Sequence, residues 1–310
     1  MQIWQAAILG VVEGLTEYLP VSSTGHLIIT SALLGLDEPA DVKQATDTFN
    51  IVIQGGAILA VLGLYASRVR SMIAGLLGRD ADGRRLAFNI IVAFIPAVIL
   101  GLLLEEAIEA WLFKPLPVII ALALGGVLLL VLGPWQRRQF ARVAGEASES
   151  GGADGDADGD GDAGASDASF RSIDQLNWRH ALIIGLMQCV AMIPGTSRSM
   201  MTIVGGMVVG LRPKDAAEFS FLLGLPTLGG ACVYKVGKEL MRSGDEANMF
   251  EVLGAGPIIV GLIAATISAA LAVKWFVGYL GRRGMGIFGW YRIALAGVLA
   301  ALWMGGIVFK

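Results

Sequence analysis

The sequence predicts an all-α integral membrane protein with six transmembrane helices and two re-entrant helical hairpins, arranged as an inverted-topology repeat. Hydrophobic residues make up 55% of the 310-residue chain and charged residues only 16%, which is too apolar for a soluble domain of this length. Six apolar stretches come close to the roughly 20 residues that a helix needs to cross a bilayer. Two further apolar segments are each interrupted by Pro, Gly, Ser and Thr. These observations together define the predicted fold class.

The six predicted spans are continuous apolar runs with few charged residues. A helix of this length can satisfy all its backbone hydrogen bonds internally, as the bilayer core requires. Three spans precede a long polar connection and three follow it. The predicted spans are residues 47–65, 86–104, 116–132, 218–236, 252–276 and 287–309.

The two interrupted segments cover residues 3–36 and 178–211. In each, an apolar stretch ends at a proline, Pro20 or Pro194, and a shorter apolar stretch follows. The shorter stretch at residues 26–36 would reach only about 16 Å as a helix. Because non-helical backbone in a bilayer must be buried in protein or line a wet cavity, we expect two re-entrant hairpins. Their second helices are expected to begin at His26 and Met200.

The chain divides into two similar halves. Residues 1–136 hold one hairpin and three spans, and residues 178–310 hold the same set. Residues 137–177 form the linker between them. Each half crosses the membrane an odd number of times, so the second half enters from the opposite side. Paired broken helices in such an inverted repeat indicate a central binding site.

Positive charge predicts the orientation of this arrangement. The connections at residues 68–85, 137–179, 212–214 and 274–283 carry more Lys and Arg than the connections on the other face. Basic connections remain in the cytoplasm. We therefore expect both termini, the first hairpin and the opening of the active site on the outer face of the cell membrane.

The linker contains an insertion at residues 145–169 that is rich in Gly, Ala, Ser and Asp. Its low hydrophobicity and repeated negative charges predict disorder. Calcium binding is the alternative for the Asp-Gly alternation, but the terminal bidentate Glu of an EF-hand loop is missing. The acidic surplus and the pI near 5.5 suggest a high-salt habitat as a hypothesis.

The first break concentrates polar side chains at a depth where they are costly and therefore indicate function. Glu13 and Glu17 lie four residues apart on a helix, so both carboxylates share one face and could hold a divalent cation. As a structural alternative, Ser23 or Thr24 would cap the next helix. That alternative explains one hydroxyl group but not the whole set, which also includes Ser22 and His26.

The second break contributes a positive charge. Arg198 is the sole charged residue of the apolar stretch that surrounds this break. A guanidinium group beside hydroxyl groups and a helix N-terminus suits a phosphate. A buried ion pair with Glu13 or Glu17 is the alternative, and it could also form in the resting state. The neighbouring hydroxyl groups belong to Ser197, Ser199 and Thr202.

Both breaks closely resemble the two signature motifs of the undecaprenyl pyrophosphate phosphatase family, the bacitracin-resistance protein type. The resemblance extends along the chain outside residues 145–169. It implies a membrane enzyme that removes the terminal phosphate of a C55-type polyprenyl diphosphate and regenerates the monophosphate carrier lipid for surface glycan export. The two motifs are Glu13-Gly-Leu-Thr-Glu17-Tyr-Leu-Pro-Val-Ser-Ser-Thr-Gly-His26 and Pro194-Gly-Thr-Ser-Arg-Ser-Met-Met-Thr202.

The resemblance also implies the roles of individual residues. Glu13 and Glu17 would bind a divalent cation, Mg²⁺ or Ca²⁺. The implied partners are the polyprenyl diphosphate and membrane lipid, without nucleic acid, and Gly-rich helix faces allow a homodimer as well as intramolecular packing. The implied catalytic residues are Glu13, Glu17, Ser23, His26 and Arg198. The implied phosphate-binding residues are Ser22, Thr24, Ser197, Arg198, Ser199 and Thr202.

Several alternatives stay open at this point. An inverted repeat with broken helices is also a transporter architecture, so a transporter or lipid flippase is the main competing function. The run Ser23-Thr24-Gly25-His26 faintly resembles the Ser-Gly-His core of the type-2 phosphatidic acid phosphatases. That class is rejected, because it needs a Lys-bearing Arg-Pro motif and a catalytic His after its Ser-Arg segment, whereas the other histidine here, His180, precedes Ser197-Arg198. Within the phosphatase mechanism, either Ser23 or a water is the nucleophile, and either His26 or a glutamate is the base.

Overall fold

The computed structural model describes residues 1–150, 170–241 and 249–309, and its regular secondary structure in these ranges is helical. A single β-bridge joins Arg171 and Leu211. The helices are α1 (Ile3–Thr16), α2 (Ser23–Leu33), α3 (Ala40–Leu64), α4 (Ala66–Leu76), α5 (Ala81–Leu112), α6 (Pro115–Ser150), the 3₁₀ turn η1 (Ile173–Gln175), α7 (Trp178–Val190), α8 (Arg198–Val208), α9 (Pro213–Leu240), α10 (Met249–Leu253), α11 (Ala255–Arg283) and α12 (Gly286–Met304).

Helices long and apolar enough to cross a membrane number six in the described part of the chain: α3, α5, α6, α9, α11 and α12. Each one contains most of a predicted span, so the expected number and position of the spans are confirmed. The chain is therefore an all-α, multi-pass membrane protein. The prediction for the last span ran too far, because α12 ends at Met304 and turn residues follow it.

Helix α6 continues well beyond its apolar part, to Ser150. The predicted linker therefore begins within a helix, and the prediction of disorder is wrong for residues 145–150. The reason lies in the sequence of this stretch, where Gln, Arg and Ala residues favour a helix even without an apolar face. The remainder of the predicted disordered insertion, residues 151–169, lies outside the described residues.

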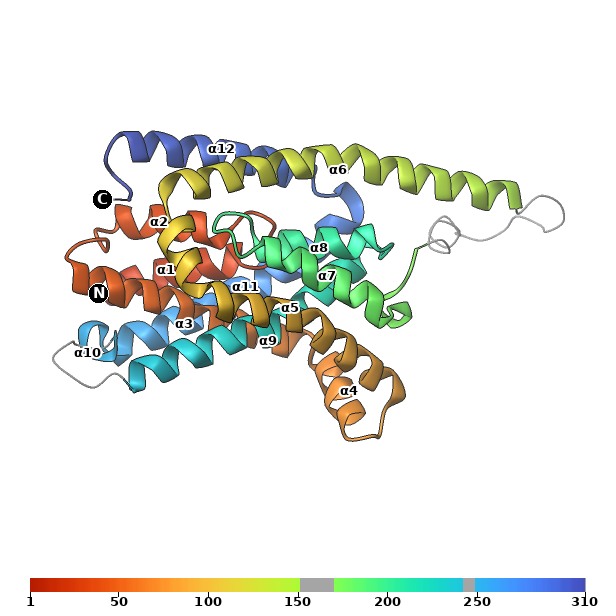
Figure 1. The fold of residues 1–310 in the computed structure, drawn as a ribbon, viewed down its shortest axis with the longest axis horizontal. Coiled ribbons are helices and arrows are strands. Elements are labelled where there is room, and N and C mark those ends of the chain that lie inside the picture. The colour runs from red at the N-terminus through yellow and green to blue at the C-terminus, as the bar shows by residue number, and fades with distance from the viewer. Residues whose placement is uncertain (151–169, 242–248, 310) are drawn as a thin grey trace.

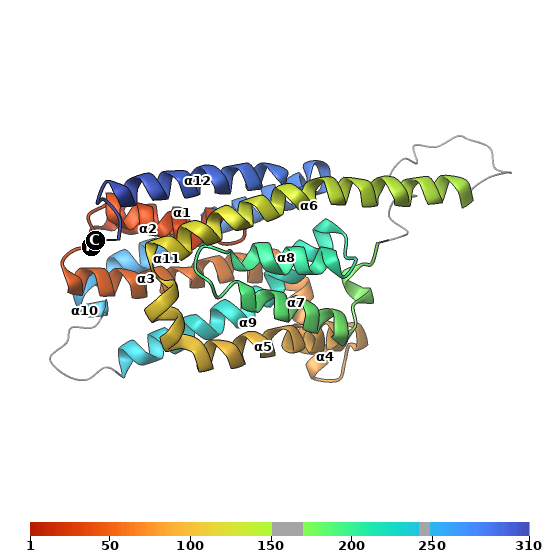
Figure 2. The same cartoon turned by 45° about the horizontal axis from the view of Figure 1, so that its top comes forward.

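The helices lie side by side along the long axis of the molecule (Figures 1 and 2). Both chain ends, α10, and the start of α1 lie at one end of the bundle, and α4 and the end of α6 lie at the other. Helices α1 and α2 occupy the first end, whereas α7 and α8 occupy the second. The loop of each helix pair reaches the middle of the bundle, where hydrogen bonds join the two loops.

The two halves of the chain pack reciprocally. Helix α1 packs against α11 and helix α7 packs against α5, so each of these short helices contacts the second long helix of the other half. Glycines permit both contacts. A Cβ atom at Gly10 would lie 2.3 Å from the carbonyl oxygen of Gly261, and one at Gly185 would lie 2.4 Å from that of Ala93. Helices α6 and α12, and α3 and α9, also pair across the halves.

Candidate active site

Two serines shape the breaks in the same way. Ser22 and Ser197 precede α2 and α8 with positive φ angles of 71° and 77°. Each side chain accepts a hydrogen bond from the backbone N–H three residues later, that of Gly25 at 3.5 Å or of Met200 at 3.3 Å. Positive φ costs a non-glycine residue about 1 kcal/mol or more and is concentrated at functional sites.

These caps correct two expectations. Helix α2 begins at Ser23 and α8 at Arg198, earlier than the predicted starts at His26 and Met200. Ser22, rather than Ser23 or Thr24, caps α2. The physical reason is that the cap must hold a non-helical conformation, and the sharp turn falls one residue before the predicted cap. Ser23 and Arg198 consequently lie at equivalent places, the first position of their helices.

Glu17 joins the two breaks. It is the C-cap of α1 and is 7% exposed. Its Oε1 accepts a hydrogen bond from Arg198 Nη2 at 3.0 Å, and its Oε2 accepts one from Ser23 Oγ at 2.7 Å. Arg198 also donates from Nη1 to the carbonyl oxygen of Ser220 at 2.9 Å. The buried ion pair considered for Arg198 is therefore present, with Glu17 as its partner.

The hydroxyl groups near Arg198 in the sequence make hydrogen bonds of their own. Ser199 Oγ donates to the carbonyl oxygen of Leu19 in the first break at 2.9 Å and lies 3.1 Å from Ser197 Oγ. Thr202 is fully buried and its Oγ1 lies 2.6 Å from Ser220 Oγ of α9. Ser199, in the first turn of α8, thus connects that helix to the first break, whereas Thr202 connects α8 to α9.

Several buried polar atoms of this cluster have no hydrogen-bond partner in the described part of the chain. They are both carboxylate oxygens of Glu13, the hydroxyl of Tyr18 and Nε of Arg198. Glu13 is fully buried and interacts electrostatically with Glu17 and Arg198. A buried polar group without a partner costs about 1–3 kcal/mol, so four such atoms in one cluster need a functional explanation.

These atoms fit a divalent cation and a phosphate. Carboxylate oxygens that lack a donor suit a hard cation, and a buried guanidinium N–H suits an anion. No group of three or more His, Cys, Asp or Glu side chains within the described ranges could hold a metal ion. Magnesium nevertheless needs only one or two carboxylates when phosphate oxygens and waters complete its ligands.

His26 lies apart from the Glu17 cluster. Its Nδ1 is 2.7 Å from the carbonyl oxygen of Ser22, and its Nε2 is 2.7 Å from the hydroxyl of Tyr291. The two rings stack at 5.6 Å with an interplanar angle of 8°. Because a carbonyl only accepts, Nδ1 carries a proton and donates it to the carbonyl oxygen of Ser22. Thr24 lies half-buried in the first turn of α2.

Helix α12 contributes two residues that the sequence analysis missed. Tyr291 contacts His26, and the fully buried Arg292 donates hydrogen bonds to the carbonyl oxygens of Pro20 and Gly195, one in each break. The available signal was the position of Arg292, a lone cation within an apolar span, since such residues are functional candidates by default.

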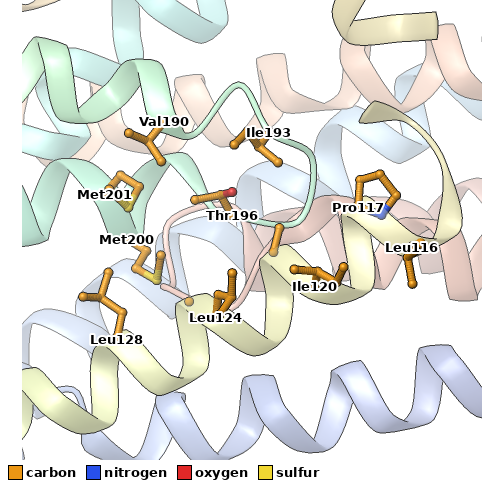
Figure 3. A pocket seen from close by; sticks show the side chains of 12 residues that line it. Leu116, Pro117, Ile120, Leu124, Leu128, Val190, Ile193, Thr196, Met200 and Met201 are labelled. Carbon is orange, nitrogen blue, oxygen red and sulfur yellow. The ribbon is translucent and has the colours of Figure 1, made fainter. Parts of the chain in front are cut away.

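An apolar pocket of about 370 Å³ adjoins the second break (Figure 3). Leu116, Ile120, Leu124 and Leu128 of α6 form one wall. Residues of the break and of α8 form the other, among them Thr196, Met200 and Met201. The pocket therefore places an apolar surface directly beside the polar cluster.

The fold and this site define a multi-pass membrane protein with a charged cluster buried in its helix bundle. Comparison with known families identifies the family within this class. The model of the family described as "Bacitracin resistance protein BacA" matches residues 6–298, so the chain belongs to that family.

Curated relatives agree along nearly the whole chain. The protein named "Undecaprenyl-diphosphatase 2" from Rhodospirillum rubrum is 43% identical over 304 residues, covering 97% of this chain and 95% of the relative. The proteins named "Undecaprenyl-diphosphatase" from Azotobacter vinelandii and Cupriavidus metallidurans are 40% and 42% identical over 314 and 305 residues. These matches cover 99% and 98% of this chain, and 98% and 96% of the relatives.

Proposed function

We propose that the chain is an undecaprenyl-diphosphatase, which hydrolyses undecaprenyl diphosphate to the monophosphate and inorganic phosphate and so recycles the carrier lipid of cell-surface glycan synthesis. The names of its relatives support the substrate and the reaction. The observation that carries the proposal is the buried contact of Ser23, Glu17 and Arg198, because it brings a nucleophile, a base and an anion-binding group together. These relatives do not favour a transporter or flippase.

Arg198 would bind the terminal phosphate of the substrate. Its Nε has no partner in the described chain, so this N–H is free for a phosphate oxygen. The N-termini of α2 and α8 add backbone N–H groups and helix dipoles that favour an anion. The expected additional hydroxyl donors are Ser22, Thr24, Ser197, Ser199 and Thr202.

Ser23 is the nucleophile that the geometry favours. Its hydroxyl already donates to Glu17 Oε2 at 2.7 Å, so Glu17 can take the proton as Ser23 Oγ attacks the terminal phosphorus. A P–O bond forms to Ser23, and the P–O bond to the lipid monophosphate breaks. Water then hydrolyses the phosphoserine and releases inorganic phosphate. In the alternative mechanism, Ser23 and Glu17 orient a water that attacks the terminal phosphorus directly. His26 could act as the base only after its hydrogen bond to Tyr291 breaks.

Glu13 and Glu17 would hold the divalent cation. The two oxygens of Glu13 are the part of this pair that no donor in the described chain engages. A bound Mg²⁺ or Ca²⁺ neutralises charge on the phosphate groups, which is the main demand of phosphoryl transfer.

The prenyl chain would extend from the polar cluster along the apolar pocket. The walls of this pocket are aliphatic, and Thr196 connects them to the second break. An isoprenoid chain buries apolar area there at no cost in unsatisfied polar groups. This placement leaves the diphosphate at the breaks and the chain between α6 and α8.

The proposed membrane arrangement consists of two repeats, residues 1–136 and 178–310, with re-entrant hairpins at residues 3–36 and 178–211. The reciprocal packing of α1 on α11 and of α7 on α5 supports an inverted repeat. The opposite directions from which the two helix pairs reach the middle support re-entrant hairpins. With the basic face in the cytoplasm, both termini and the opening of the site lie on the outer face of the cell membrane.

A phosphate-release assay with the purified full-length protein tests the proposal. We expect release from undecaprenyl diphosphate, less release from farnesyl diphosphate, and loss of release with a chelator that added Mg²⁺ or Ca²⁺ reverses. Absence of phosphate release from every prenyl diphosphate by folded protein would contradict the proposed function. Release that a chelator leaves unchanged would contradict only the cation.

A further inference from the structure

Arg292 connects four segments from within the bundle. It projects from α12, is fully buried, and donates to four backbone carbonyl oxygens. Two belong to α6, those of Leu122 at 3.3 Å and Ala121 at 3.2 Å. The other two lie in the breaks, those of Pro20 at 3.4 Å and Gly195 at 2.7 Å. One guanidinium group therefore contacts both halves of the candidate site.

The surrounding glycines make room for this side chain. A Cβ atom at Gly125 of α6 would lie 2.3 Å from Arg292 Nη2. At the next residue, a Cβ on Gly126 would lie 2.8 Å from the carbonyl oxygen of Gly289, and the converse contact is also 2.8 Å. The close approach of α6 and α12 thus lets the guanidinium reach past α6 to the breaks.

The charge of Arg292 has no acidic counterpart. All four of its hydrogen bonds go to neutral carbonyl groups, and no carboxylate of the described residues forms an ion pair with it. A buried charge without a counterion is costly, so such a residue inside a membrane indicates a function. An apolar side chain at this position would pack α12 against its neighbours equally well.

The two break carbonyls occupy matching places. Pro20 lies two residues before Ser22, and Gly195 lies two residues before Ser197. These serines cap the helices whose first residues are Ser23 and Arg198. A shift of either carbonyl would therefore move the proposed nucleophile relative to the proposed phosphate-binding group.

We propose that Arg292 is a positioning residue that holds the two breaks in register. This inference rests on the proposed phosphatase function for its kinetic consequence but not for its structural one. Arginine is required because its planar fork can reach both breaks and α6 at once, whereas the single ammonium group of lysine cannot.

The kinetic test compares Arg292→Lys and Gly125→Ala with wild type in the phosphate-release assay. Gly125→Ala displaces the guanidinium without changing its charge, and Gly297→Ala on α12 is the control because its Cβ would meet no atom within 4 Å. We expect kcat to fall about 10- to 100-fold in both test variants, as for a misplacement of about 1 Å, with KM within about threefold. Wild-type kcat in either folded test variant would overturn the inference. A wild type without activity would instead contradict the proposed function.

A distance measurement tests the inference without activity. Spin labels at Leu33 and Val208, which are 65% and 55% exposed on α2 and α8, report the separation of the helices behind the breaks. With Cys189 and Cys232 replaced by Ala, we expect a narrow distribution that shifts or broadens in Arg292→Lys and Gly125→Ala but not in Gly297→Ala. An unchanged distribution would overturn the proposal. So would loss of folded protein in both test variants, since Arg292 would then serve folding.

Discussion

Arg198 and Glu17 form an ion pair at 3.0 Å although 181 residues separate them in the chain. The pair connects the second break to the first and leaves Arg198 Nε without a partner in the described chain. Glu17 also accepts a hydrogen bond from the hydroxyl of Ser23. The ion pair therefore holds the proposed anion-binding group, the proposed base and the proposed nucleophile within one cluster.

Replacement of Arg198 by lysine should abolish most of the activity. Lysine keeps the charge but loses the fork that joins Glu17, Ser220 and a phosphate oxygen. We expect phosphate release to fall by about 10²- to 10³-fold, as for the loss of one donor to a developing charge. Arg85→Lys is the control, since Arg85 forms an exposed pair with Asp82. Near-normal turnover of folded Arg198→Lys would remove Arg198 from the site.

Glu13→Gln should weaken cation binding but leave the protein folded. The substitution keeps the shape of the side chain but removes a proposed ligand of the cation, so we expect about 10²-fold lower activity at low Mg²⁺ and partial recovery at high Mg²⁺. The melting temperature should stay the same or rise, because a fully buried carboxylate without a donor disappears. Glu106→Gln, at an exposed position, serves as the control. A loss of activity that is independent of Mg²⁺ concentration would argue against Glu13 as a ligand.

Ser23 should become phosphorylated during turnover. Acid quenching followed by mass spectrometry should detect phosphate on Ser23, and Ser23→Ala should lower turnover by about 10³-fold. Ser31→Ala on the same helix is a matched control, because Ser31 Oγ has no hydrogen-bond partner in the described chain. If Ser23→Ala retains much of the turnover while Glu17→Gln does not, water is the nucleophile.

Tyr291→Phe should lower activity modestly. The phenyl ring keeps the stacking on His26, but the hydrogen bond to Nε2 is lost. A hydrogen bond contributes about 1 kcal/mol, so we expect a roughly fivefold lower kcat if the orientation of His26 matters for turnover. Tyr279→Phe, which keeps its ring contacts with Trp275 and Phe288, is the comparison. Equal kcat in both variants would show that turnover does not depend on the hydrogen bond between Tyr291 and His26.

The proposed orientation predicts which residues a membrane-impermeant thiol reagent reaches in intact cells. In a background with Cys189→Ala and Cys232→Ala, Met304→Cys should react from outside, and Leu77→Cys should react only after permeabilisation. Both positions are well exposed, at 79% and 66%, so access depends on the side of the membrane. If Leu77→Cys reacts from outside and Met304→Cys only after permeabilisation, the protein has the opposite orientation in the membrane.

The number and position of the membrane helices were readable from hydrophobicity. An apolar run of about 20 residues has few stable alternatives to a spanning helix in a bilayer, whatever its neighbours are. Hydrophobicity did not predict the end of α6, which continues into polar sequence as far as Ser150. It also did not predict the starts of α2 and α8, because Ser23 and Arg198 precede the apolar residues of these helices.

The types of residue in the site could also be predicted from the sequence, because charged and hydroxyl side chains are costly in apolar membrane segments and therefore indicate function. Glu13, Glu17, Ser23 and Arg198 were recognisable one by one. Their partners were not. Whether Arg198 would pair with Glu13 or Glu17 depended on the direction in which each side chain leaves its helix, and spacing along the chain does not specify that direction across 181 residues.

Composition and motifs are thus enough to predict an all-α membrane protein with two polar breaks and the types of residue that they contribute. The packing of the helices places Glu17 between Ser23 and Arg198, His26 against Tyr291, and Arg292 against both breaks. The difference comes from the range of the interactions. Burial of an apolar stretch in a bilayer depends on local composition, whereas a hydrogen bond depends on the packing of distant helices to within a fraction of an ångström.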